Sequence, residues 1–155
     1  MIAEFGLAAL WLAAALAVLQ LGEKGQSMAS LVRPVAAVQG ALALASFGAL
    51  IWLFCRTDLS VKLVALNSHS AKPFIYKLAG TWGNHEGSML LWVTVMACAG
   101  GFLALVEKRL PERTMLATLA GQAFVSLGFY AFLLISSNPF ERISPAAPEG
   151  QGLNP

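Results

Sequence analysis

Four long runs of apolar residues constrain this chain more than any other feature. They extend over residues 5–21, 35–55, 89–106 and 115–135. A helix needs about 20 mostly apolar residues to cross the hydrocarbon core of a bilayer, and each run reaches or approaches that length. A helix also satisfies its backbone hydrogen bonds within one segment, as a bilayer demands. The runs therefore predict an all-α, polytopic membrane domain over residues 1–135, with four transmembrane helices.

Composition favours a membrane protein over a soluble helical bundle. Apolar residues make up 57% of the chain and charged residues 12%, whereas a soluble domain usually carries about 25% charged residues. The net charge of +2 comes without any long Lys/Arg run, which excludes nucleic acid as a partner. Cys55 and Cys98 have neither CxxC nor CxxCH spacing, so we interpret both as small apolar core residues.

The polar segments between the runs predict turns, one long loop and a tail. Arg33-Pro34 precedes the second run, and proline suits the first turn of a helix. Residues 57–84 never reach bilayer length, so we expect a partly ordered external loop at the membrane surface, with a turn at Lys72-Pro73. Residues 136–155 are polar and rich in proline and glycine. They predict an extended external tail that continues into a further C-terminal part.

The distribution of charge predicts the orientation in the membrane. Residues 1–4 hold an acid and no base, unlike the start of a signal peptide, so we interpret the first run as an uncleaved span. The two short connectors hold five basic residues near the span ends, and the long loop and the tail hold five that are more dispersed. Because the positive-inside rule weighs density near span ends, we expect the short connectors in the cytoplasm and both termini outside.

Small residues recur four positions apart within three of the runs. Such spacing lets helix backbones approach closely in lipid, so we expect helix–helix contacts there. The pairs are Ala36 and Gly40, Ala97 and Gly101, and Ala117 and Gly121.

Titratable and aromatic side chains gather at the start of the third run, in the stretch TWGNHEGSMLLW. On a structural interpretation, Asn84 is the N-cap of the helix and Glu86 complements the helix dipole. On a functional interpretation, a neutral His85 ligates haem iron or contacts a propionate, because ionisable groups at a membrane boundary are costly. A metal site is not predicted, because no second carboxylate or cysteine stands at helical spacing. The candidate site comprises Trp82, Gly83, Asn84, His85, Glu86, Gly87, Ser88 and Trp92.

Four segments resemble the N-terminal portion of the CcmF family, the large membrane subunits of cytochrome c haem lyases, and of their NrfE-type paralogues. These segments are MIAEFGLAALWLA, VALNSHSAKPFIYKLAGTWGNHEGSMLLW, KRLPE and SSNPFERISPAAPEGQGLNP. The resemblance covers essentially all of this chain and a minor fraction of the family's length. It implies a multi-pass protein of the bacterial inner membrane with the N-terminus and both longer polar segments in the periplasm.

The resemblance also implies a role and a set of partners. In the family, haem delivered by the haem chaperone CcmE is attached to apocytochrome c, with CcmH-type and CcmI-type subunits and the remainder of the haem lyase. A haem b within the membrane bundle is implied for the full-length family. The chain is thus identified as an N-terminal segment of a haem lyase subunit in cytochrome c maturation, surrounded by membrane lipid.

The chain also departs from the family's pattern. The tryptophan-rich external motif of the WGxWWxWD kind has no counterpart here, and the family's external haem-ligating histidine falls beyond the equivalent of Pro155. Neither His69 nor His85 matches a family ligand, so this segment alone is expected neither to ligate haem nor to be catalytic. It is a fragment, a truncated copy or one piece of a split protein. The alternatives are a small haem- or quinone-contacting electron-transfer subunit and an assembly scaffold without chemistry.

Overall fold

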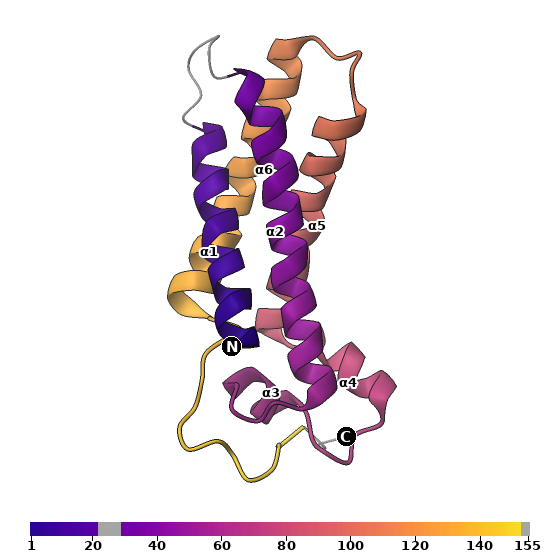
Figure 1. Ribbon diagram of the computed structural model, residues 1–155, viewed down its shortest axis with the longest axis vertical. Helices are drawn as coiled ribbons and strands as arrows, with labels where there is room; N and C mark the ends of the chain where they lie inside the picture. Colours follow the sequence, from indigo (N-terminus) through magenta and orange to yellow (C-terminus); the bar gives the residue numbers. More distant parts are fainter. Residues whose placement is uncertain (22–28, 153–155) are drawn as a thin grey trace.

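Four long helices stand side by side in the computed structural model, which describes residues 1–21 and 29–152 (Figure 1). Each is long and apolar enough to cross a membrane, which confirms the prediction of a four-span helical protein. In chain order they are α1 (Ile2–Leu21), α2 (Ala29–Arg56), α5 (His85–Val106) and α6 (Glu112–Ala131).

The second helix begins earlier than its apolar run. α2 starts at Ala29, so Pro34 lies inside the helix and the expected place in the first turn is wrong. Val32 explains the extra turn, because its side chain is buried in a small cluster with Met115 and Leu119. Arg33 supports the same region, since its guanidinium donates hydrogen bonds to backbone carbonyls at the end of α5, which a helix C-terminus leaves unpaired.

Between α2 and α5 the chain forms two short helices at one end of the bundle. They are α3 (Lys62–Asn67) and α4 (Phe74–Gly80), so the loop is more ordered than its sequence indicates. α3 buries Leu63, Val64 and Ala65 beneath the bundle. α4 begins directly after Pro73 and has no buried residue. The amide of Lys72 donates to the carbonyl of His69, which confirms the predicted turn before Pro73.

The last helix ends in a wider turn and leads into the tail. α6 continues as η1 (Phe132–Ser136), a π-helical turn. Beyond it, the described residues 137–152 contain no helix. The tail runs along the end of the bundle and reaches α3 (Figure 1).

Close contact between α2 and α5 organises the bundle. A Cβ atom on Gly40 would lie 2.9 Å from the carbonyl oxygen of Ala97, and one on Gly101 would lie 3.0 Å from that of Ala36. The two predicted small-residue pairs therefore pack against each other. The third pair makes no such contact, because nothing lies within 4 Å of a Cβ built on Gly121.

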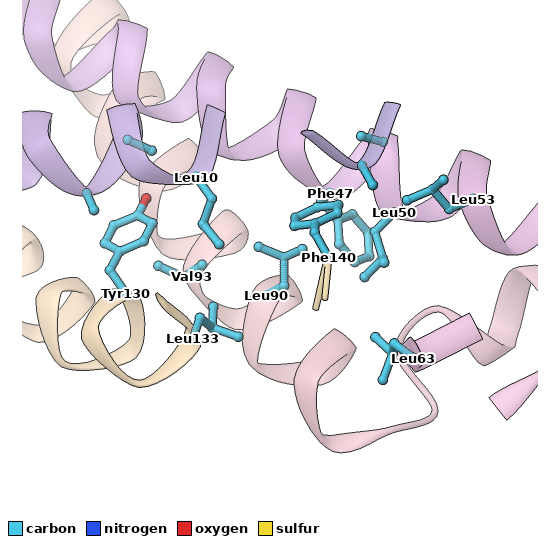
Figure 2. Packing of buried hydrophobic residues seen from close by; sticks show 14 of the residues in the cluster. Leu10, Phe47, Leu50, Leu53, Leu63, Leu90, Val93, Tyr130, Leu133 and Phe140 are labelled. Carbon is cyan, nitrogen blue, oxygen red and sulfur yellow. The ribbon is translucent and has the colours of Figure 1, made fainter. Parts of the chain in front are cut away.

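The core fills the space between these helices (Figure 2). It draws side chains from all four spans, from α3 and from the tail, whose Phe140 is only 3% exposed. Polar groups also cross the bundle: Gln39 accepts a hydrogen bond from Gln20 at 2.6 Å and donates one to Tyr130 at 3.4 Å. Such buried amides join helices in lipid. The labelled core residues are Leu10, Phe47, Leu50, Leu53, Leu63, Leu90, Val93, Tyr130, Leu133 and Phe140.

Candidate functional site

The predicted cap at the start of α5 is confirmed. The side-chain oxygen of Asn84 accepts a hydrogen bond of 2.7 Å from the amide of Gly87. Its side-chain nitrogen donates one of 2.7 Å to the carbonyl of Gly80. Asn84 thus satisfies one of the free amides of a helix start and also joins α5 to the end of α4.

Glycine is required one turn into α5. A Cβ atom on Gly87 would lie 1.7 Å from the carbonyl oxygen of Thr81, far inside van der Waals contact. The amide of Gly83 donates to Ala79 and closes α4, and the Ser88 hydroxyl donates to the His85 carbonyl. Glu86 occupies the first turn of α5, as predicted. Most of this stretch therefore has a structural explanation.

Aromatic and imidazole side chains of the same stretch face outward. Trp82 and Trp92 are both exposed on the protein surface, the position expected of groups that contact lipid at different depths. The ring of His85 lies edge-on to Phe132, with the ring centroids 5.2 Å apart. His85 also lines a groove of about 270 Å³ together with Met89 and Phe129. The structure thus pairs His85 with α6 and η1, not with the loop between α2 and α5.

The tail is fastened to the loop by backbone hydrogen bonds. Val61 and Arg142 form an antiparallel bridge. Two backbone hydrogen bonds flank this bridge. The amide of Lys62 donates to the carbonyl of Glu141 at 2.8 Å, and the amide of Ile143 donates to the carbonyl of Ser60 at 2.9 Å. We call residues 57–84 and 137–152 together the loop–tail platform.

A second fastening holds the far end of the tail. The carboxylate of Glu149 accepts hydrogen bonds from the amide (3.1 Å) and the hydroxyl (2.6 Å) of Ser70. These contacts lower the pKa of Glu149 to about 2. The hydrogen bond from the Ser70 hydroxyl has the largest effect, followed by those from the amides of Gly150 and Ser70. A Cβ atom on Gly150 would lie 1.9 Å from the Ser68 carbonyl oxygen, so the tail backbone lies directly on the loop.

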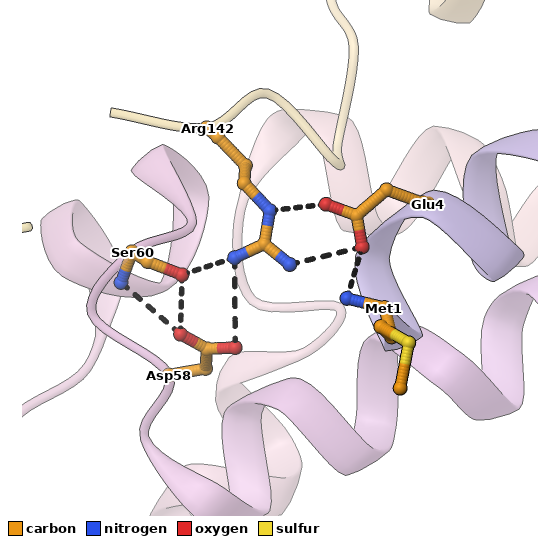
Figure 3. Close-up of polar contacts among 5 residues, drawn as sticks. All are labelled: Met1, Glu4, Asp58, Ser60 and Arg142. Carbon is orange, nitrogen blue, oxygen red and sulfur yellow. Dashed lines mark hydrogen bonds and ion pairs between the residues drawn. The ribbon is translucent and has the colours of Figure 1, made fainter. Parts of the chain in front are cut away.

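Arg142 ties the platform to the first helix (Figure 3). Its guanidinium donates to both carboxylate oxygens of Glu4 and to the hydroxyl of Ser60. Asp58 lies 4.0 Å away. The hydrogen bond to Glu4 raises the pKa of Arg142, so the side chain stays charged. One side chain therefore links α1, the loop and the tail, and a bidentate pair of this kind fixes geometry as well as charge.

Known proteins with this sequence pattern are bacterial cytochrome c-type biogenesis proteins. CycK of Bradyrhizobium diazoefficiens is 45% identical over the whole chain, which covers 24% of CycK. CcmF of Pseudomonas aeruginosa is 41% identical over the whole chain, which covers 25% of that protein. The solved structure of the cytochrome c haem lyase CcmF matches 90% of the chain and 23% of its own length, with a TM-score of 0.70 at 24% identity. No family model matches.

The chain is a homologue of the N-terminal part of CcmF. It spans about a quarter of the length of the CcmF and CycK relatives. NrfE of Haemophilus influenzae is also related, at 37% identity over 71% of the chain. The four apolar helices and this relationship together make the chain part of an integral membrane protein.

The histidines of this CcmF homologue do not fit a haem. Nδ1 of His69 accepts a hydrogen bond from the amide of Ala71, so the neutral ring carries its proton on Nε2, 3.9 Å from Glu149. An iron ligand must be an unprotonated nitrogen. The groove beside His85 holds about 270 Å³, below the roughly 300–1,000 Å³ of typical ligand pockets. Among the described residues, no group of three or more His, Cys, Asp or Glu is placed to hold a metal.

Sequence reasoning missed the residues that hold the tail of this CcmF homologue in place. Phe140 and Arg142 lie in the SNPFER segment that carries the resemblance, yet no role followed from it. The available signal was electrostatic. Glu4 is an acid in the first turn of an apolar helix, and Arg142 is the one basic residue of the tail sequence.

Proposed function

We propose that the chain is the N-terminal membrane part of a haem lyase subunit that acts in cytochrome c maturation. The observation that supports this most strongly is the match to CycK and CcmF over the whole chain, at 45% and 41% identity. Its contribution is structural: the four helices carry the loop–tail platform on which the haem-handling part of the subunit is built. The chain itself performs no covalent chemistry.

The platform lies on the periplasmic side of the inner membrane in this proposal. The end of α2, the start of α5 and the tail all meet at one end of the bundle (Figure 1). The basic residues Lys108 and Arg109 lie in the short connector between α5 and α6, and Arg113 lies in the first turn of α6. Such a cluster next to span ends favours the cytoplasm, which supports an external position for the platform.

Partners follow from the same placement. Haem arriving from a CcmE-type chaperone and apocytochrome c would both approach from the platform side, beside CcmH-type and CcmI-type subunits. The haem b of the complete lyase would be ligated by residues outside this chain, because Nδ1 of His69 already accepts a hydrogen bond from the amide of Ala71 and His85 lines only a small groove.

A maturation assay tests the proposal. Deleting the gene in its host should abolish covalent haem in c-type cytochromes, detected by haem staining of denaturing gels, and the intact gene should restore it. His85→Ala should leave staining unchanged at equal protein level. Lost staining at normal protein level would show a direct role for His85. Unchanged cytochromes in the deletion strain would exclude cytochrome c maturation as the function.

Thiol labelling in intact cells tests the orientation. In a background with Cys55 and Cys98 replaced by alanine, cysteine at Ser70 or Ala146 should react with a membrane-impermeant reagent. Cysteine at Pro111 should react only after the cells are opened. The opposite pattern would place the platform in the cytoplasm.

A further inference from the structure

A pocket of about 460 Å³ opens where the end of α2 meets the start of α1. Its polar side is formed by Arg56, Asp58 and Arg142, and its apolar side by Ile2, Trp52 and Leu53. α1 begins at Ile2 and α2 ends at Arg56, so the pocket lies at the membrane boundary. A ligand bound here would meet charge on one side and hydrocarbon on the other.

The two arginines of this pocket differ in their partners. Arg142 is engaged by Glu4 and lies near Asp58, and the amine of Met1 pairs with the same Glu4. Arg56 forms no ion pair within 4 Å in the part of the chain that the structure describes. Its guanidinium instead lies over the ring of Trp52, 5.9 Å from the centroid. The acids Glu4 and Asp58 thus lie against Arg142, and the charge of Arg56 is left available to an anion.

The apolar wall of the pocket is partly exposed at the surface of the bundle. Trp52 is 51% exposed and Ile2 38% exposed, whereas Leu53 forms a buried floor. Trp52 lies one turn before Arg56 on α2, and its ring carries the guanidinium at the end of the helix, where a charged group can reach headgroup depth. A planar guanidinium in such a place binds phosphate oxygens in pairs, and apolar surface beside it suits an acyl chain.

We propose that this pocket, the Arg56 pocket, binds one anionic phospholipid, with the phosphate on Arg56 and the upper acyl chain against Trp52 and Ile2. Basic pockets between transmembrane helices bind anionic headgroups by the same chemistry. The bound lipid would fill the gap between α1 and α2 next to Arg142. This site is separate from the proposed role in cytochrome c maturation and would exist in any membrane that holds the chain.

Native mass spectrometry of the detergent-purified protein tests the site. After equilibration with phosphatidylglycerol, the wild type should retain one lipid, and Arg56→Gln should lower the retained fraction about fivefold. The matched control is Arg109→Gln, another exposed arginine in the α5–α6 connector at the other end of the bundle, which should retain lipid like the wild type. Equal retention by Arg56→Gln and wild type, or equal loss in both variants, would overturn the proposal.

Two measurements on the unchanged protein identify the ligand. Phosphatidylcholine, whose headgroup carries a compensating cation, should be retained less than phosphatidylglycerol. Millimolar inorganic phosphate should leave the bound lipid in place, because it lacks the acyl chain. Equal retention of both lipids would contradict an anionic ligand, and displacement by phosphate would show a simple anion site. Equal helix content by circular dichroism confirms that Arg56→Gln is folded.

Discussion

The ring of Phe140 occupies the space that a side chain at position 6 would fill. A Cβ atom built on Gly6 would lie 2.4 Å from Cε1 of that ring and 3.1 Å from the Cβ of Ala49. A residue of the tail is thus inserted between α1 and α2, and the absence of a side chain on Gly6 makes this possible. The tail is therefore part of the hydrophobic core and not a loose extension.

Removing the Phe140 ring should destabilise the whole bundle. Phe140→Ala should lower the free energy of unfolding by about 3–5 kcal/mol, and Gly6→Ala by about 1–3 kcal/mol because it overpacks the same space. Unfolding by sodium dodecyl sulfate from a mild detergent measures both. Phe124→Ala is the control, since Phe124 is 70% exposed on α6, and should change stability by no more than about 0.5 kcal/mol. Equal effects at both phenylalanines would contradict insertion of the tail.

Breaking the pair between Glu4 and Arg142 should loosen the tail without unfolding the helices. Glu4→Gln and Arg142→Gln should each speed hydrogen exchange at the amide of Ile143, which donates to the Ser60 carbonyl. The double variant should exchange little faster than either single one, because both changes remove the same contact. Glu112→Gln at the other end of the bundle should have no effect. Fully additive effects would show that the two side chains act independently.

Adding a methyl group at Gly87 should disrupt the start of α5. The new Cβ would overlap the Thr81 backbone oxygen, so the α4–α5 connection must move, at a cost on the order of 3 kcal/mol. Protein level in membranes and detergent unfolding report the change. Gly121→Ala meets open space on α6 and should stabilise by about 0.5–1 kcal/mol. Equal outcomes at the two glycines would contradict the close contact at Thr81.

Docking of the far end of the tail should weaken in acid. Hydrogen bonds from Ser70 lower the pKa of Glu149 from 4.5 to about 2, so the carboxyl group binds its proton more weakly when docked. Its contribution is present above pH 4.5 and is lost as the pH falls toward 2. His69, 3.9 Å away, faces the same carboxylate. Amide NMR shifts of Ser70 and Gly150 should report this titration, and Glu149→Gln should remove it.

The parts of the fold that depend on local sequence could be predicted. The spans follow from hydropathy over about 20 consecutive residues, and the cap at Asn84 follows from a residue type next to an apolar run. The start of α2 was predicted wrongly, because a charged residue followed by proline is typical of the start of a helix, as at Arg33-Pro34. In the structure Arg33 instead reaches the end of α5, and Val32 packs in a buried cluster.

The parts that depend on distant residues could not be predicted. α3 and α4 are too short to show a clear helical periodicity of apolar residues. Their positions depend on contacts with the end of the four-helix bundle. The tail is polar and rich in proline and glycine, so its composition indicates an extended segment and hides the buried Phe140. The Glu4–Arg142 pair joins opposite ends of the chain, and no local pattern predicts such a contact.

The reciprocal contacts of Gly40 and Gly101 limit how α2 and α5 can move relative to each other. They bring the backbones of α2 and α5 together at two levels, and steric contact between backbones cannot relax as side chains do. The loop leaves from the end of α2 and returns at the start of α5, so both of its anchor points belong to helices whose backbones touch. A hinge that separates α2 from α5 would break these backbone contacts. Any movement of the loop–tail platform is therefore expected to come from a common tilt of the two helices, which carries the platform with them.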